Sequence, residues 1–133
     1  MSVSLNTFLL HPRLRLFLLA LASLMYLTIL VAGSIPGARA DIGHYASGAV
    51  LHSTAYGVLA ALWFLGTRGT RGARAAKAML AVAMMGAGDE FVQSFFPYRG
   101  AAVGDWAVDC AAAAVTTLLL CLFVPKRLAA PGH

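Results

Sequence analysis

Two adjacent acidic residues, Asp89 and Glu90, lie inside an otherwise apolar stretch of the chain, "AMLAVAMMGAGDEFVQSFF". An ionised side chain at the centre of a membrane-spanning helix costs roughly 2.5 to 3.5 kcal/mol on insertion scales, so such residues need a reason. Gln93 follows four residues after Asp89 and three after Glu90, which places the three side chains on one face of a helix. We expect that face to point into the protein.

The same polar spacing recurs in two other apolar segments. His52 and Tyr56 are four residues apart, and so are Asp105 and Asp109. At 1.5 Å per residue the three stripes reach similar depths, roughly 9 Å from the outer end of the helix for Glu90. We therefore predict one ligand-binding cluster near the non-cytoplasmic side, formed by His52, Tyr56, Asp89, Glu90, Gln93, Arg99, Asp105 and Asp109.

The charges of this cluster do not balance. Its four carboxyl groups face Arg99 as the nearby permanent cation, and His52 supplies a second positive charge only if it is protonated. Protonated carboxyl groups, a bound cation or a cationic ligand would each neutralise the remainder. Arg99 at the rim of the cluster is suited to meet a phosphate or carboxylate group.

The cluster could serve catalysis, or it could serve only the packing of the helices. His52, Asp89 and Glu90 are the candidates for general acid or base catalysis, although the nearby serine and cysteine side chains have no activating context for a nucleophile. Polar groups within membranes also serve helix packing alone. The spacing of the histidine and carboxyl groups does not resemble a dense metal site, so we predict no metal and no cofactor.

The elements that would position these residues are long apolar helices. Of the 133 residues, 60% are hydrophobic and only 11% are charged, which is too little charge to cover a soluble domain of this size. Roughly 20 apolar helical residues cross a bilayer. We predict an all-α membrane protein, a compact bundle of four transmembrane helices with spans at about 14–33, 48–66, 78–96 and 105–124.

A cleaved secretory signal is an alternative for the first span. Ala38, Arg39 and Ala40 form a small-x-small triplet just before Asp41. The apolar core before them is longer than the roughly 7 to 15 residues typical of such signals, which favours a span that is retained.

The ten basic residues predict the orientation of these spans. Two of them, Arg13 and Arg15, lie at the start of the first span, and the following loops and the C-terminal tail carry one, four, one and two, so that every second segment is basic. Basic segments stay in the cytoplasm. We expect cytoplasmic tails at 1–12 and 126–133 around a membrane domain at 13–125. The net charge of +5 therefore reports topology, and we predict no nucleic-acid partner.

Three ordered motifs, "HSTAYGVL", "GDEFVQSFFPYRG" and "DWAVD", resemble the VanZ-like family of small bacterial membrane proteins. The resemblance runs from His52 to the end of the chain, and the matching positions are His52, Tyr56, Asp89, Glu90, Gln93, Pro97, Arg99 and Asp105. Two positions depart from the family pattern, because an Asn of the family falls on Asp109 and a frequent Lys falls on Ala49. The resemblance implies a four-helix, multi-pass protein of the bacterial cytoplasmic (inner) membrane and an association with resistance to teicoplanin-type glycopeptides.

Several functions follow from these residues. We favour an outer-leaflet polar cavity that binds a cell-envelope molecule, such as a lipid-linked wall precursor, or an amphiphilic antibiotic. The alternatives are a membrane-embedded acid/base enzyme acting on an envelope lipid or amide, and a structural or regulatory subunit of an envelope complex. Proton or ion movement is the weakest hypothesis, because the inner halves of the spans are almost wholly apolar. The sequence does not indicate an oligomeric state.

Overall fold

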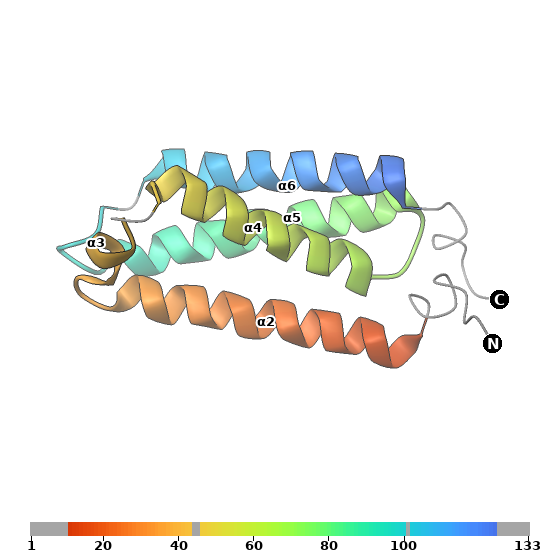
Figure 1. Cartoon of the computed structure of the whole chain (residues 1–133), viewed down its shortest axis with the longest axis horizontal. Coiled ribbons are helices and arrows are strands. Elements are labelled where there is room, and N and C mark those ends of the chain that lie inside the picture. Colours follow the sequence, from red (N-terminus) through yellow and green to blue (C-terminus); the bar gives the residue numbers. More distant parts are fainter. Residues whose placement is uncertain (1–10, 44–45, 101, 125–133) are drawn as a thin grey trace.

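The computed structural model describes residues 11–43, 46–100 and 102–124. Within these residues the chain is all-helical, with four long helices and one short one (Figure 1). Their bounds are Pro12–Ser34 for α2, Ala38–Gly43 for α3, Gly48–Gly66 for α4, Arg71–Gln93 for α5 and Val103–Phe123 for α6. The predicted tails, apart from His11 and Pro12, lie outside the described residues.

Side-chain caps fix where three of the long helices begin. The side chain of His11 accepts a hydrogen bond from the N–H of Arg13 at the start of α2. Ser47 caps α4 and Thr70 caps α5 in the same way. Such caps satisfy backbone N–H groups that have no partner inside the helix. A glycine at Gly69, with a φ of 122°, allows the tight connection between α4 and α5.

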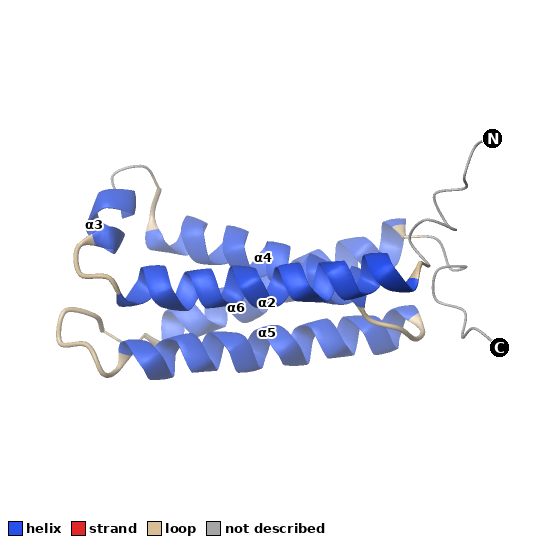
Figure 2. Cartoon of the chain, turned by 90° about the horizontal axis from the view of Figure 1, so that it is seen from below, coloured by secondary structure: helices blue, strands red, loops and turns tan. Residues whose placement is uncertain are grey.

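The four long helices form one antiparallel bundle, in which each runs opposite to the next along the chain (Figure 1). α4 contacts each of the other three long helices and packs most extensively against α6. The buried core lies along this central helix and is made by Ala22, Tyr56, Leu59, Ala60, Val82 and Ala113. Figure 2 shows α2 in front of the bundle, with α4 and α5 to either side of it.

Three helices, α2, α4 and α6, are long and apolar enough to cross a membrane. Large apolar side chains such as Phe17, Leu24 and Leu118 are more than half exposed on the outside of the bundle. In water such a surface would be unfavourable, whereas lipid tails cover it without cost. These features are those of a membrane protein. α5 has the length to cross but carries five charged residues, at Arg71, Arg74, Lys77, Asp89 and Glu90.

The predicted spans agree with the observed helices to within three residues, except at the start of α5. The sequence predicts a span at 78–96, whereas α5 begins seven residues earlier at Arg71 and ends at Gln93. The basic segment before residue 78 is helical because Thr70 caps it and because Arg, Ala and Lys favour helices. Hydropathy locates the apolar part of a helix and misses its polar first turns. The short helix α3 was not predicted either.

Arg74 joins two helices at the end of the bundle opposite α3. It is 2% exposed, and its Nε donates to the carbonyl oxygen of Phe64 at 2.7 Å while its Nη2 donates to that of Leu65 at 3.2 Å. Its guanidinium also lies 4.8 Å from the centre of the Phe64 ring. Carbonyl groups in the last turn of a helix have no intrahelical partner, so Arg74 in α5 caps the C-terminal end of α4.

Candidate functional site

A cavity of about 210 Å³ lies between α2, α4 and α5 at the end of the bundle that carries α3. It is lined by Ile29, Ala32, Gly33, Gly48, Leu51, His52, Ala55, Tyr56, Asp89, Gln93 and Arg99. The residues from α2 are all apolar or glycine, whereas α5 contributes only polar side chains. A ligand in this cavity would meet an apolar wall on one side and charged or polar groups on the other.

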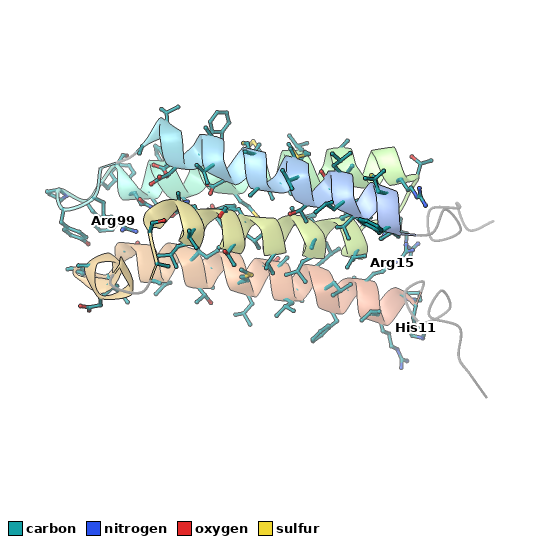
Figure 3. The ribbon with its side chains drawn as sticks, turned by 45° about the horizontal axis from the view of Figure 1, so that its top comes forward. His11, Arg15 and Arg99 are labelled. Atoms are coloured by element: carbon teal, nitrogen blue, oxygen red, sulfur yellow. The ribbon has the colours of Figure 1, made fainter. Side chains whose placement is uncertain are left out.

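Arg99 lines the cavity from the loop between α5 and α6. It also lines a second hollow formed with Ile35, Gly37, Ala40, Tyr98 and Gly100. Figure 3 shows Arg99 at the opposite end of the bundle from His11 and Arg15. The side chain of Tyr98 fixes this loop, because its hydroxyl donates to the carbonyl oxygen of Ser34 at 2.7 Å.

Asp89 is the buried carboxyl group of the cavity. It is 2% exposed, and its Oδ2 accepts a hydrogen bond from the Tyr56 hydroxyl at 3.3 Å. Its other oxygen, Oδ1, is buried without a hydrogen-bond partner among the described residues. A buried carboxylate oxygen without a partner is energetically costly, so Asp89 has unused capacity to accept a donor.

Gly33 in α2 leaves the space into which these polar groups project. A Cβ atom added at Gly33 would lie 3.2 Å from Arg99 Nη2, 3.6 Å from Asp89 Oδ1 and 3.7 Å from Gln93 Nε2. Two donor groups and one acceptor therefore converge on a single point in the cavity wall. An alanine here would place its methyl group at this point and would require Arg99 Nη2 to shift by a few tenths of an ångström.

His52 is held between two carboxyl groups of α6. Its Nδ1 lies 2.9 Å from Asp109 Oδ1, and its Nε2 lies 3.7 Å from Asp105 Oδ2. The ring is stacked on Tyr56, with ring centroids 5.9 Å apart and planes 8° apart. An imidazolium ring can donate from both nitrogens, so this environment is suited to the charged form of His52. The ring thus links α4 to α6 and presents one face toward Tyr56.

Asp109 is fully buried behind His52, and a glycine makes room for it. A Cβ atom at Gly86 in α5 would lie 2.9 Å from Asp109 Oδ2, closer than real Cβ atoms approach an oxygen. The glycine admits the carboxyl group between α5 and α6.

Glu90 points away from the cavity. Its Oε2 accepts a hydrogen bond at 2.6 Å from the backbone N–H of Ala102, the residue that precedes α6 and provides no side-chain cap of its own. Its Oε1 is buried without a hydrogen-bond partner in the described part of the chain. A carboxylate near the first turn of a helix interacts favourably with the helix dipole, so Glu90 of α5 stabilises the start of α6.

The eight predicted site residues thus fall into three groups. Five of them line the cavity, namely His52, Tyr56, Asp89, Gln93 and Arg99. Asp105 and Asp109 lie behind His52, and Glu90 caps α6. The sequence reasoning missed the wall formed by Ile29, Ala32 and Gly33, although their spacing of three and four residues marks one face of the first helix.

The described residues favour neither a metal site nor an activated nucleophile. No three His, Cys, Asp or Glu side chains among them are arranged to hold a metal ion. The hydroxyl groups of Ser53 and Ser94 donate to carbonyl oxygens of their own helices, at Val50 and Phe91. The arrangement can bind and orient a polar group, and His52 with Asp109 is the pair that could move a proton.

The fold and the cavity define a small all-helical protein with three helices able to cross a membrane and a polar pocket at one end of the bundle. No protein-family model, curated protein or solved structure matches the chain. The resemblance to VanZ-like proteins therefore stays a prediction, and functional inference depends on the site itself.

Proposed function

We propose that this chain is a membrane-embedded binding protein whose cavity takes the polar headgroup of a cell-envelope molecule or of an amphiphilic antibiotic. The observation that carries the proposal is the cavity at the end of the bundle, with an apolar wall from α2 opposite Asp89, Gln93 and Arg99. Binding sites for small molecules commonly combine apolar walls with a few convergent polar groups. An amphiphile has these two parts in one molecule.

The size of the cavity supports a headgroup as its occupant. Cavities that enclose whole drug-sized ligands measure roughly 300 to 1,000 Å³, and this one measures about 210 Å³. An envelope lipid would therefore place only its polar end inside, and its apolar part would lie in the surrounding bilayer. The VanZ-like resemblance adds the expectation that such binding contributes to teicoplanin-type resistance in a bacterial inner membrane.

The proposal includes four crossings with the cavity on the outer side and both termini in the cytoplasm. α5 runs alongside α4 and α6, and its charged residues are confined to its two ends. A single cysteine placed at Arg68 or at Gly100, in a chain lacking Cys110 and Cys121, tests this arrangement with a membrane-impermeant thiol reagent. We expect labelling of intact cells at position 100 only. Labelling at both positions, or at neither, would contradict it.

Resistance to teicoplanin in a sensitive bacterial host tests the function. At matched membrane abundance we expect protection by the parent chain and its loss in Asp89→Asn and Arg99→Gln. Asp41→Asn and Arg68→Gln remove the same charges from exposed positions outside the cavity, and we expect them to protect like the parent. A parent that gives no protection would remove the resistance proposal, and protection by all four variants would exclude the cavity as its source.

An acid/base enzyme is the second candidate, because the contact between His52 and Asp109 at 2.9 Å is typical of a histidine oriented for proton transfer. His52 Nε2 faces Asp105, so a substrate would have to displace that carboxyl group. Incubation of the purified protein with envelope lipid extract, followed by mass spectrometry, tests it. A product that forms with the parent and not with His52→Gln would favour the enzyme over the binding protein.

A further inference from the structure

The cavity contains a basic and an acidic side chain, Arg99 and Asp89, that are not hydrogen-bonded to each other in the described part of the chain. Arg99 Nε and Nη1 are buried without a hydrogen-bond partner among the described residues, and so is Asp89 Oδ1. Arg99 Nη2 and Asp89 Oδ1 nevertheless both lie within 4 Å of the point where a Cβ of Gly33 would be. The two groups thus face one small space, and no ion pair joins them in the part of the chain that is described.

The chemistry of the missing partner follows from this arrangement. Arg99 can only donate, and it recognises phosphate and carboxylate oxygens through paired N–H groups. An ionised Asp89 can only accept, so its free oxygen requires an N–H or O–H donor. Gln93 lies beside both and can donate or accept. One ligand that satisfies Arg99 and Asp89 together must carry an anionic oxygen and a nearby hydrogen-bond donor.

The charges of the cavity and its apolar lining further restrict the class of ligand. One buried acid and one basic side chain favour a ligand that itself carries one charge of each sign, because the complex is then neutral within a medium of low dielectric constant. The apolar part of the cavity lining comes from α2 and α4, through Ile29, Ala32, Leu51 and Ala55. Apolar side chains on the outer surface of α2, such as Leu24 and Leu27, continue along the same helix. Acyl chains would follow this surface.

We propose that the cavity binds the phosphoethanolamine headgroup of a membrane phospholipid, with the phosphate on Arg99 and the primary ammonium on Asp89 Oδ1. This inference rests on the proposed function and names the class of amphiphile. The primary ammonium is the recognised feature, because it has N–H groups to donate. A choline headgroup carries the same charge without any N–H donor, and a glycerol headgroup carries the phosphate without a cation.

Native mass spectrometry of the full chain in detergent provides the test, with phosphatidylethanolamine, phosphatidylcholine and phosphatidylglycerol of identical acyl chains. A hydrogen bond between charged groups that is present with one lipid and absent with another changes affinity by about tenfold or more. We expect phosphatidylethanolamine to bind at least tenfold more tightly than the other two lipids.

Variants then assign the two contacts. Asp89→Asn should reduce the preference for phosphatidylethanolamine over phosphatidylcholine to less than threefold, whereas Arg99→Gln should weaken both lipids together. Asp41→Asn and Arg68→Gln are the matched controls and should retain the preference. If Asp89→Asn does not fold, Gly33→Ala is used in its place. Its added Cβ occupies the point that Arg99 and Asp89 both face, and it should weaken the binding of phosphatidylethanolamine several-fold.

The outcomes separate this inference from the function on which it rests. Equal affinity of the parent for all three lipids, abolished by Arg99→Gln, would overturn the headgroup assignment and leave a phosphate-binding cavity. Tighter binding of phosphatidylglycerol would also overturn it. Absence of saturable binding to all three lipids overturns the assignment as well, and binding of teicoplanin to the same preparation would then show that the cavity functions with another amphiphile.

Discussion

The imidazole Nδ1 of His52 in α4 lies 2.9 Å from Oδ1 of the fully buried Asp109 in α6. This contact joins the two helices that pack together most extensively, and it brings together residues 57 positions apart in the chain. The pair also positions the ring of His52 against Tyr56 and hence one wall of the cavity. A single polar contact therefore stabilises the bundle and shapes its candidate site.

The coupling between His52 and Asp109 is measurable with a double-mutant cycle. His52→Gln and Asp109→Asn should each lower the free energy of unfolding by roughly 1.5 to 3 kcal/mol, since each breaks a charge-assisted hydrogen bond. The double variant should lose less than the two losses added together. Titration with denaturing detergent gives the energies. Pairing Asp109→Asn with Lys77→Gln, at the other end of the bundle, should be additive, and additivity in the first cycle would disprove the coupling.

Tyr56→Phe removes the hydrogen bond that the Tyr56 hydroxyl donates to Asp89 Oδ2. Both oxygens of the buried carboxyl group would then lack a hydrogen-bond partner among the described residues, and we expect a loss of roughly 1 to 3 kcal/mol of stability. Tyr98→Phe is the control, because it removes the same atom from an exposed bond to a neutral carbonyl oxygen. Its loss should be smaller, about 0.5 to 1.5 kcal/mol. Equal melting temperatures of the two variants would show that loss of the hydrogen bond to the buried Asp89 carboxyl group carries no additional cost in stability.

Gly33→Ala tests whether the point of convergence is used by a ligand. The new methyl group would lie 3.2 Å from Arg99 Nη2 and should weaken lipid binding several-fold in the same native mass spectrometry assay. Gly72→Ala is a matched helical substitution into open space, and it should raise stability by about 0.5 to 1 kcal/mol without changing binding. Unchanged affinity in Gly33→Ala would place the ligand elsewhere.

Glu90→Ala leaves the N–H of Ala102 without its acceptor. Loss of a helix cap costs about 0.5 to 2 kcal/mol, and the first turn of α6 should exchange its amide hydrogens faster. Glu90→Gln keeps a carbonyl oxygen at this position and loses only the charge, which is worth about 0.3 to 1 kcal/mol at a helix terminus. Hydrogen exchange with mass spectrometry compares the two. Similar exchange in both variants would show that the charge, and not the hydrogen bond, stabilises this turn.

Arg74→Lys preserves the charge and removes the planar group that donates to two carbonyl oxygens. We expect a loss of roughly 1.5 to 3 kcal/mol, because a lysine cannot reproduce both bonds and the ring contact with Phe64. Lys77→Met is the exposed comparison, since Lys77 Nζ donates to the carbonyl oxygen of Arg68 at 2.8 Å. Its loss should stay below 1 kcal/mol. Thermal unfolding in detergent compares the two variants. Equal unfolding midpoints would show that the buried contacts of Arg74 contribute no more to stability than the exposed hydrogen bond of Lys77.

Much of the fold follows from local patterns in the sequence. The apolar run that ends before Thr67 predicts α4 at residues 48–66, as observed, because a long uncharged segment is bounded by turn residues on both sides. The spacing of four residues correctly places His52 with Tyr56, and Asp89 with Gln93, on shared faces. Helical periodicity suffices for these relationships because each concerns one helix.

Relationships between helices were harder to predict. Asp89 and Glu90 are adjacent and chemically alike, yet one enters the cavity and the other caps α6. Successive residues on a helix point about 100° apart, and only the positions of neighbouring helices decide which partner each residue meets. The role of Gly33 was missed for the same reason, because it depends on Arg99 and Asp89, which come from other parts of the chain and face the space beside this glycine.

The two ends of the bundle differ in charge, and this difference bears on the orientation proposed for the protein in a membrane. All five acidic residues belong to the end that carries α3, whereas the opposite end carries Arg13, Arg15, Arg68, Arg71, Arg74 and Lys77. Antiparallel helices largely cancel each other's macrodipoles, so the electric asymmetry of the bundle comes from its side chains. An energised membrane is negative inside and would hold the basic end there. The respiratory state of the cell would thus reinforce a single orientation of the molecule.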